Sequence, residues 1–159
     1  MASVGDQAPD FTATIVAEED GTMVLSDRLS DEAPIVLVFF PGPFTPTCTD
    51  ELTAFQDDLD TYNEIGATIY AVHTDTPKSL EVFRDQSGIE FSLLSDTARN
   101  VVDAYDVRCD FEQYGLIGVP DRAVFVIDST GKITYKWIAD DISQEPDYEL
   151  IKEAVRNSI

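Results

Sequence analysis

Two patterns of apolar residues meet at Pro41-Gly42-Pro43-Phe44-Thr45-Pro46-Thr47-Cys48-Thr49-Asp50-Glu51-Leu52. Before it comes the β-branched and aromatic run Pro34-Ile35-Val36-Leu37-Val38-Phe39-Phe40, which is typical of a buried central strand. After it, apolar residues recur at helical spacing, at Leu52, Phe55, Leu59 and Tyr62. A strand is therefore expected to end near Phe40 and a helix to begin near Cys48.

The residue types around Cys48 predict the start of this helix. Three prolines argue against helix before Cys48, Thr47 or Thr49 can cap it, and Asp50 and Glu51 fall in its expected first turn. The first turn has N–H groups without intrahelical partners and the positive end of the helix dipole, and both favour a thiolate over a thiol. Cys48 is therefore either a nucleophile or, like most free cysteines, a small buried apolar residue.

Pro41, Thr45 and Cys48 match the P-x-x-x-T-x-x-C signature of the peroxiredoxins, which are thiol peroxidases on a thioredoxin-like scaffold. The signature region is especially similar to the one-cysteine branches, among them the bacterioferritin-comigratory-like and alkyl hydroperoxide reductase E-like proteins. Two more stretches resemble the family, namely Gly5-Asp6-Gln7-Ala8-Pro9-Asp10-Phe11 and Val119-Pro120-Asp121-Arg122-Ala123-Val124-Phe125-Val126-Ile127-Asp128. The resemblance thus spans nearly the whole chain.

The resemblance implies a reaction and a role for each matching residue. The Cys48 thiolate attacks one oxygen of hydrogen peroxide or a small alkyl hydroperoxide, becomes a sulfenic acid, and expels the other oxygen. Arg122 favours the thiolate and hydrogen-bonds the peroxide, and the Thr45 hydroxyl serves the peroxide as donor and acceptor. Pro41 shields the sulfur from water. No haem, flavin or metal cofactor is implied.

Two supporting roles follow from the same resemblance. Glu51 matches a position whose carboxylate orients the arginine, and backbone N–H groups around Thr47 complete the pocket. The apolar residues flanking Arg122 predict that it is buried, and a buried arginine needs a partner.

Sulfenylated Cys48 must be reduced again, and the sequence leaves two routes open. The position five residues after Cys48 is Thr53, and no cysteine follows Arg122, so two common resolving positions are empty. Cys109 either resolves Cys48 or is a bystander while an external thiol does the work. That thiol could be thioredoxin-like, glutaredoxin-like or of low molecular weight. The one-cysteine route is favoured, because aspartates at 106 and 110 raise the pKa of a thiol, although Arg108 opposes them.

The composition is that of one acidic domain over residues 1–159, with 31 acidic and 10 basic residues and a net charge of −21. Such a surface repels phosphates, so nucleic acid and anionic membranes are poor partners. No apolar run approaches ~20 residues, and residues 1–6 lack the features of a signal peptide, so a cytoplasmic location is expected. Acidic clusters such as Glu18-Glu19-Asp20 lack the spacing of a calcium loop, and no metal site is expected. The acidic bias resembles haloarchaeal proteins.

The remaining pattern predicts an α/β protein of thioredoxin-like fold, with a central mixed sheet flanked by helices and an N-terminal β-hairpin. Strands are expected at 11–16, 22–25, 68–72, 91–94, 122–127 and 132–138, the last two as a hairpin. Helices are expected at 26–30, 48–64, 76–88, 99–105 and 147–158, the last burying Leu150, Ile151, Ala154 and Val155, and a loop at 107–118. His73 is expected to be structural or solvent-facing, and Trp137 to lie in the core or on a dimer surface. A homodimer or higher homo-oligomer is expected by analogy with the family.

Two other functions fit the same fold class. A thioredoxin-like disulfide oxidoreductase would need a second cysteine close to the first, and Cys48 has none. A non-catalytic binding module on the thioredoxin scaffold would leave Cys48 inert.

Overall fold

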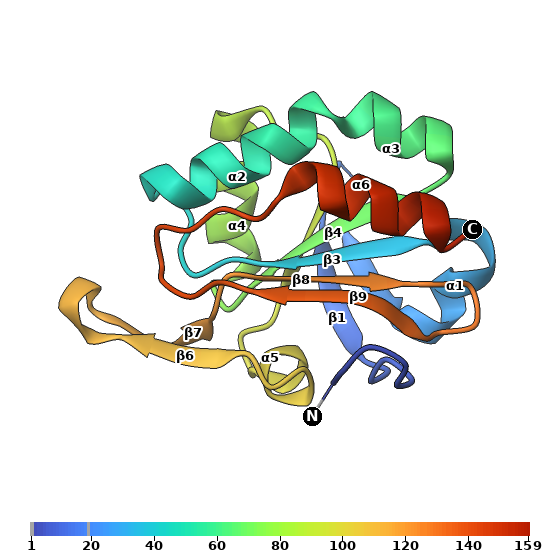
Figure 1. Cartoon of the computed structure of the whole chain (residues 1–159). Helices are drawn as coiled ribbons and strands as arrows, with labels where there is room; N and C mark the ends of the chain where they lie inside the picture. The colour runs from blue at the N-terminus through green and yellow to red at the C-terminus, as the bar shows by residue number, and fades with distance from the viewer. Residues whose placement is uncertain (1, 19) are drawn as a thin grey trace.

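A seven-stranded sheet forms the centre of the computed structural model, which describes residues 2–18 and 20–159 (Figure 1). Its strand order is β2-β1-β5-β4-β3-β8-β9. The strands are β1 (Thr12–Val16), β2 (Gly21–Val24), β3 (Ile35–Phe39), β4 (Thr68–His73), β5 (Ser92–Ser95), β8 (Ala123–Ile127) and β9 (Ile133–Ile138). Strands β3, β4 and β5 are parallel neighbours, whereas β1, β8 and β9 pair antiparallel. The predicted mixed sheet and N-terminal hairpin β1–β2 are confirmed, although Glu19, in the predicted turn, lies outside the described residues.

Strand β3 is central because both of its faces are apolar. All five of its residues are buried. Successive side chains point to opposite faces of a strand, so Leu37 and Phe39 join one apolar cluster while Val36 and Val38 join the other. This is the pattern of a strand covered on both sides.

Helices cover both faces of the sheet (Figure 1). They are α1 (Leu25–Glu32), α2 (Pro46–Asp57), α3 (Leu59–Ile65), α4 (Pro77–Ser87), α5 (Asn100–Ala104) and α6 (Tyr148–Asn157). Apolar residues of α2, α3, α4 and α6 belong to one core cluster, and those of α1 and α5 to the other. None of the helices in the described chain is long and apolar enough to cross a membrane.

Helix α2 begins earlier than the sequence pattern predicts. Its first residue is Pro46, with Thr45 in the capping position, although the Thr45 side chain makes no capping hydrogen bond. Proline is well tolerated at the first helical position because the N–H that it lacks would have no intrahelical partner there. The expectation of a cap at Thr47 or Thr49 is therefore wrong, and no acidic residue lies in the first turn.

Two further expectations about the helices need correction. The helix expected at 48–64 is interrupted at Asp58, where α3 takes over. Gly66 ends α3 in the left-handed region at φ 91°, as glycine does at helix ends. Leu150 was expected in the core but is 49% exposed, because Ile151 and Val155 form the buried side of α6.

The segment predicted to be a loop at 107–118 is an antiparallel hairpin. It consists of β6 (Arg108–Phe111), the 3₁₀ turn η1 (Glu112–Tyr114) and β7 (Leu116–Pro120). The hairpin projects from the body of the protein (Figure 1). The sequence pattern missed it because β6 has only four residues, too few for the alternation of exposed Arg108 and Asp110 with half-buried Cys109 and Phe111 to stand out.

Candidate active site

Cys48 lies in the first turn of α2 and only 1% of it is exposed. The N–H of Thr49 donates to the carbonyl of Thr45 at 2.9 Å. The N–H groups of Thr47 and Cys48 come earlier in the helix, where no carbonyl of the preceding turn is available to accept from them. Partner-free N–H groups and the helix dipole together favour negative charge at this point. The cysteine is therefore located where a thiolate is stabilised, as the sequence predicts.

Sheet pairing brings Arg122 to Cys48 from the far end of the sequence. Strand β8 pairs antiparallel with β3 so that Ala123 lies opposite Phe39, and Arg122 therefore enters beside the loop that follows β3. Its Nη1 donates to Cys48 Sγ at 3.3 Å and to Glu51 Oε1 at 3.0 Å. The three predicted residues thus form one buried cluster.

A third acceptor binds the other Nη atom of the guanidinium, while its buried Nε has no partner among the described residues. Nη2 of Arg122 donates to the carbonyl of Ile142 at 2.7 Å. This carbonyl belongs to the segment between β9 and α6, and no sequence pattern marks a main-chain acceptor. Because the fork of a guanidinium is planar, acceptors for both Nη atoms hold it in a defined orientation toward the sulfur.

Burial dominates the electrostatics of the cluster. Complete burial raises the pKa of Glu51 to about 8, although the charge and hydrogen bond of Arg122 act against this. For Arg122, burial lowers the pKa, but the charges of Glu51 and Cys48 outweigh it and the net shift is upward. Arg122 is therefore permanently charged, and Glu51 accepts one of its hydrogen bonds.

The loop before α2 holds Thr45 and Pro41. The Thr45 hydroxyl donates to the carbonyl of Gly42 at 2.7 Å, which leaves its oxygen lone pairs free to accept. Pro41 is buried, consistent with the predicted shielding role, and its carbonyl lies 2.8 Å from Nε2 of His73. Phe44 adopts φ 66°, an uncommon value for a non-glycine residue, and its ring packs edge-on against Phe83.

A pocket of about 400 Å³ opens beside the cluster. Its lining comes from α2 and the residue before it, from the β6–β7 hairpin, from the residue before β8, and from the segment after β9: Thr45, Pro46, Thr47, Tyr114, Leu116, Arg122, Ile142 and Ser143. Thr47 thus reaches the site as predicted. Tyr114 and Leu116 were not predicted to line the site because the hairpin was not predicted, and Ile142 was not because it lies in the irregular segment between β9 and α6.

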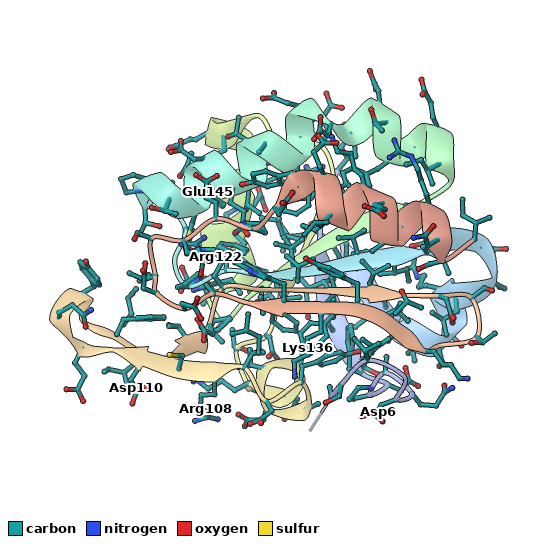
Figure 2. The ribbon with its side chains drawn as sticks, in the orientation of Figure 1. Asp6, Arg108, Asp110, Arg122, Lys136 and Glu145 are labelled. Carbon is teal, nitrogen blue, oxygen red and sulfur yellow. The ribbon has the colours of Figure 1, made fainter. Side chains whose placement is uncertain are left out.

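Cys109 is separate from this cluster. It lies on β6, is half-buried, and is a free thiol, as is Cys48. Figure 2 shows its neighbours Arg108 and Asp110 on the projecting hairpin and Arg122 within the body of the protein. Burial and then the charge of Asp121 raise the pKa of Cys109. The expected upward direction agrees, and the charge of Asp110 contributes as expected, but burial and Asp121 contribute more and neither Asp106 nor Arg108 is among the causes.

A cysteine at a helix start on a mixed α/β sheet, in contact with a buried arginine and three residues after a threonine, defines the class of thioredoxin-fold thiol peroxidases. The model of the AhpC/TSA family matches residues 4–136, and the chain belongs to this family, the peroxiredoxins. It is accordingly a thiol-dependent peroxidase, and the disulfide oxidoreductase and binding-module alternatives are not favoured.

The relatives agree with this assignment. A Mycobacterium tuberculosis protein that carries the peroxiredoxin name is 36% identical over 132 residues, which cover 81% of this chain and 80% of the relative. A chloroplastic 2-cysteine peroxiredoxin of Chattonella marina is 35% identical over 85% of this chain and 70% of the relative. The crystal structure of peroxidoxin BcpB from M. tuberculosis superposes with a TM-score of 0.84 at 26% identity, covering 99% of this chain and 98% of that one.

Proposed function

We propose that Cys48 is the thiol that reacts with the peroxide. The thiolate attacks one peroxide oxygen, an S–O bond forms as the O–O bond breaks, and sulfur gives up an electron pair. The departing hydroxide or alkoxide takes a proton from water, and Cys48 becomes a sulfenic acid. The observation that carries the proposal is the 3.3 Å contact between Arg122 Nη1 and Cys48 Sγ in a buried site.

Neighbouring groups match the charge that develops in this reaction. Negative charge moves from sulfur to the departing oxygen, so the site needs donors for both atoms. Arg122 faces the sulfur and also lines the pocket. Thr45 lines the same pocket. When the peroxide binds, the Thr45 hydroxyl gives up its hydrogen bond to the Gly42 carbonyl and forms one to the peroxide instead. The substrates are hydrogen peroxide and small alkyl hydroperoxides.

An external thiol restores Cys48 in this proposal. The thiol attacks the sulfenic sulfur, water leaves, and a second thiol reduces the resulting mixed disulfide. Support comes from Cys109, which is a free thiol with a raised pKa on the projecting hairpin. The reductant is of a thioredoxin-like, glutaredoxin-like or low-molecular-weight class.

The protein is further proposed to form a homodimer or higher homo-oligomer through the face that bears the catalytic loop. Three exposed apolar side chains support an interface at this face, because Phe44 is 53% exposed, Tyr114 63% and Ile117 56%. Clustered exposed apolar residues on soluble proteins commonly mark an interface. Analytical ultracentrifugation is expected to find an oligomer for wild type and a smaller species for Tyr114→Glu. A monomer for wild type would contradict this proposal.

The peroxidase proposal is tested by peroxide consumption with dithiothreitol as the reductant. Wild type and Cys109→Ser are expected to consume hydrogen peroxide, whereas Cys48→Ser is expected to lose activity to the uncatalysed background. Cys109→Ser is the matched control, because it removes the other thiol without touching the cluster. Equal rates for wild type and Cys48→Ser would contradict the assignment of Cys48.

A further inference from the structure

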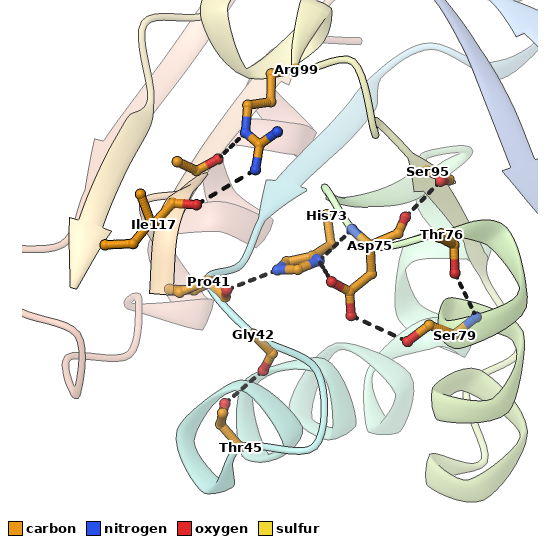
Figure 3. Close-up of polar contacts among 11 residues, drawn as sticks. Pro41, Gly42, Thr45, His73, Asp75, Thr76, Ser79, Ser95, Arg99 and Ile117 are labelled. Atoms are coloured by element: carbon orange, nitrogen blue, oxygen red, sulfur yellow. Dashed lines mark hydrogen bonds and ion pairs between the residues drawn. The ribbon is translucent and has the colours of Figure 1, made fainter. Parts of the chain in front are cut away.

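His73 is buried beside the catalytic loop and is hydrogen-bonded at both ring nitrogens (Figure 3). It is the last residue of β4, which lies next to β3 in the sheet. The N–H of Asp75 donates to Nδ1 at 2.9 Å, which requires Nδ1 to be unprotonated, and the Asp75 carboxylate lies 3.5 Å from the same nitrogen. In a neutral imidazole the other nitrogen then carries the proton, and Nε2 donates to the carbonyl of Pro41 at 2.8 Å.

The ring is held by rigid parts of the protein. It lies at 5.2 Å from the ring of Phe40, with an angle of 33° between the planes. Asp75, which supplies the N–H, is itself fixed, because its carbonyl accepts from Ser95 at 2.7 Å and its carboxylate from Ser79 at 3.2 Å. Figure 3 shows these contacts running from the loop through His73 to the start of α4. The Pro41 carbonyl is therefore tied to the sheet and to α4.

This tie acts on the part of the loop that holds the reacting groups. Pro41 and Gly42 are both buried, and their carbonyls are satisfied by His73 Nε2 and the Thr45 hydroxyl respectively. A Cβ on Gly42 would lie 3.3 Å from Cγ2 of Thr45, so the loop and Thr45 are in close contact. A shift of the Pro41–Gly42 peptide would therefore move the Thr45 hydroxyl.

We propose that His73 is a positioning residue for the peroxidase reaction. Its Nε2–H holds the Pro41–Gly42 peptide, and through it the Thr45 hydroxyl, in the geometry that the attack of Cys48 requires. The inference rests on the proposed roles of Cys48 and Thr45. A buried carbonyl left without its donor is costly, so loss of the Nε2–H favours movement of the loop.

Two amide substitutions separate the two hydrogen bonds of the ring. His73→Asn places its amide near the position of Nδ1, so it can accept from Asp75 but does not reach Pro41. His73→Gln places its amide nitrogen near the position of Nε2 and can donate to Pro41. We expect His73→Asn to lower kcat/KM for hydrogen peroxide by about 10- to 100-fold, because small misplacements of reacting groups cost rates of this size. His73→Gln should recover most of that loss.

A spectroscopic measurement tests the hydrogen bond without using activity. His73 is the one histidine of the chain, so long-range ¹H–¹⁵N correlation spectra of the imidazole contain a single set of signals. At pH 7 the wild-type spectrum is expected to show a neutral ring protonated at Nε2, with that proton protected from exchange. A ring protonated at Nδ1, or a charged ring, would overturn the proposal.

The kinetic outcomes are equally decisive. A folded His73→Asn variant with wild-type kcat/KM would overturn the inference, and so would a His73→Gln variant as impaired as His73→Asn. Thermal melting of each variant confirms that it is folded, and the comparison is made at a temperature below all transitions. If wild type itself consumed no peroxide, the proposed function would fail, while the imidazole spectrum would still report whether Nε2 donates to Pro41.

Discussion

Arg122 and Glu51 meet inside the protein, with Nη1 3.0 Å from Oε1 and with 1% and 0% of their side chains exposed. The same Nη1 also donates to Cys48 Sγ. A buried ion pair is weak evidence for stability, because the desolvation of both charges can exceed their attraction. The pair is better understood from its effect on the site, because Glu51 helps to hold the Arg122 guanidinium toward the Cys48 sulfur.

Glu51→Gln is expected to change how stability depends on pH. Glu51 has an ordinary pKa of 4.5 and a pKa of about 8 in the folded protein. A raised pKa means that its contribution to stability is complete below about pH 4.5 and is lost as pH rises through 8. Glutamine does not ionise, so the melting temperature of the variant should gain on that of wild type between these values. Expressed as free energy of unfolding, this relative gain is at most a few kcal/mol, since one pKa unit corresponds to about 1.4 kcal/mol. A constant difference from pH 5 to 8 would contradict the raised pKa.

Arg122→Lys is expected to reduce peroxidase activity although it keeps the charge. An ammonium cannot reproduce the planar fork that reaches Cys48, Glu51 and the Ile142 carbonyl together. Loss of one preorganised donor typically costs about 10²–10³ in kcat. The measurement is kcat/KM for hydrogen peroxide, with Arg108→Lys on the exposed hairpin as the control. Equal activity of Arg122→Lys and wild type would remove Arg122 from the mechanism.

Cys109 is expected to react slowly with alkylating agents at neutral pH. Burial and Asp121 raise its pKa, so the reactive thiolate is scarce. In the Cys48→Ser background, the rate of iodoacetamide labelling should rise with pH up to and beyond 9.

After one equivalent of peroxide without added thiol, mass spectrometry of wild type should find the added oxygen on Cys48. An intramolecular disulfide between Cys48 and Cys109 would instead establish Cys109 as the resolving thiol.

Gly118→Ala is expected to loosen the β6–β7 hairpin. Gly118 adopts φ 63°, and a Cβ there would lie 2.8 Å from Arg99 Nε, which donates to the Gly118 carbonyl. Gly115→Ala is the matched control, because Gly115 adopts φ 70° with nothing within 4 Å of the added Cβ. Both variants carry about 1–2 kcal/mol of backbone strain, and Gly118→Ala should lose roughly 1 kcal/mol more from the displaced hydrogen bond. Denaturant unfolding measures the difference, and equal losses would show that the Arg99 contact contributes nothing.

The excess of acidic residues predicts that stability depends on salt. With a net charge of −21, self-repulsion in the folded state is strong in dilute buffer and is screened in concentrated salt. The melting temperature should rise by at least about 5 °C between low salt and molar KCl, since about 1–2 kcal/mol has this effect in a chain of this size. NaCl at the same ionic strength should act similarly if screening is the cause. A melting temperature that does not rise with KCl would exclude a halophilic adaptation.

The central strand, the cysteine helix and the meeting of Cys48 with Arg122 were all predictable from the sequence. Apolar periodicity marks β3 and α2, and the signature residues indicate which side chains the fold must bring together. The geometry bears out that expectation, with Arg122 Nη1 at 3.3 Å from the sulfur. The onset of α2 was predicted too late, because a proline can be a first helical residue as well as a helix breaker.

The hairpin and the His73 contact could not be read from the sequence for a different reason. Strand β6 has only four residues, so its alternation of exposed and half-buried side chains is too short to be a clear signal. His73 looks like any lone histidine in the chain, and its bond to the Pro41 carbonyl arises only when β4 is placed next to β3. Main-chain acceptors such as Pro41 and Ile142 are invisible to residue patterns, because every residue has a carbonyl.

With 1% of Cys48 exposed, the size of a molecule decides when it can touch the sulfur. A hydroperoxide group is small enough to approach from the pocket beside Arg122 while α2 stays folded. Thiol exchange with a protein partner requires direct sulfur-to-sulfur contact, which the folded first turn of α2 prevents. A small hydroperoxide would therefore need no change in α2 to approach Cys48, whereas a protein thiol would reach the sulfur only after a local rearrangement at the start of this helix.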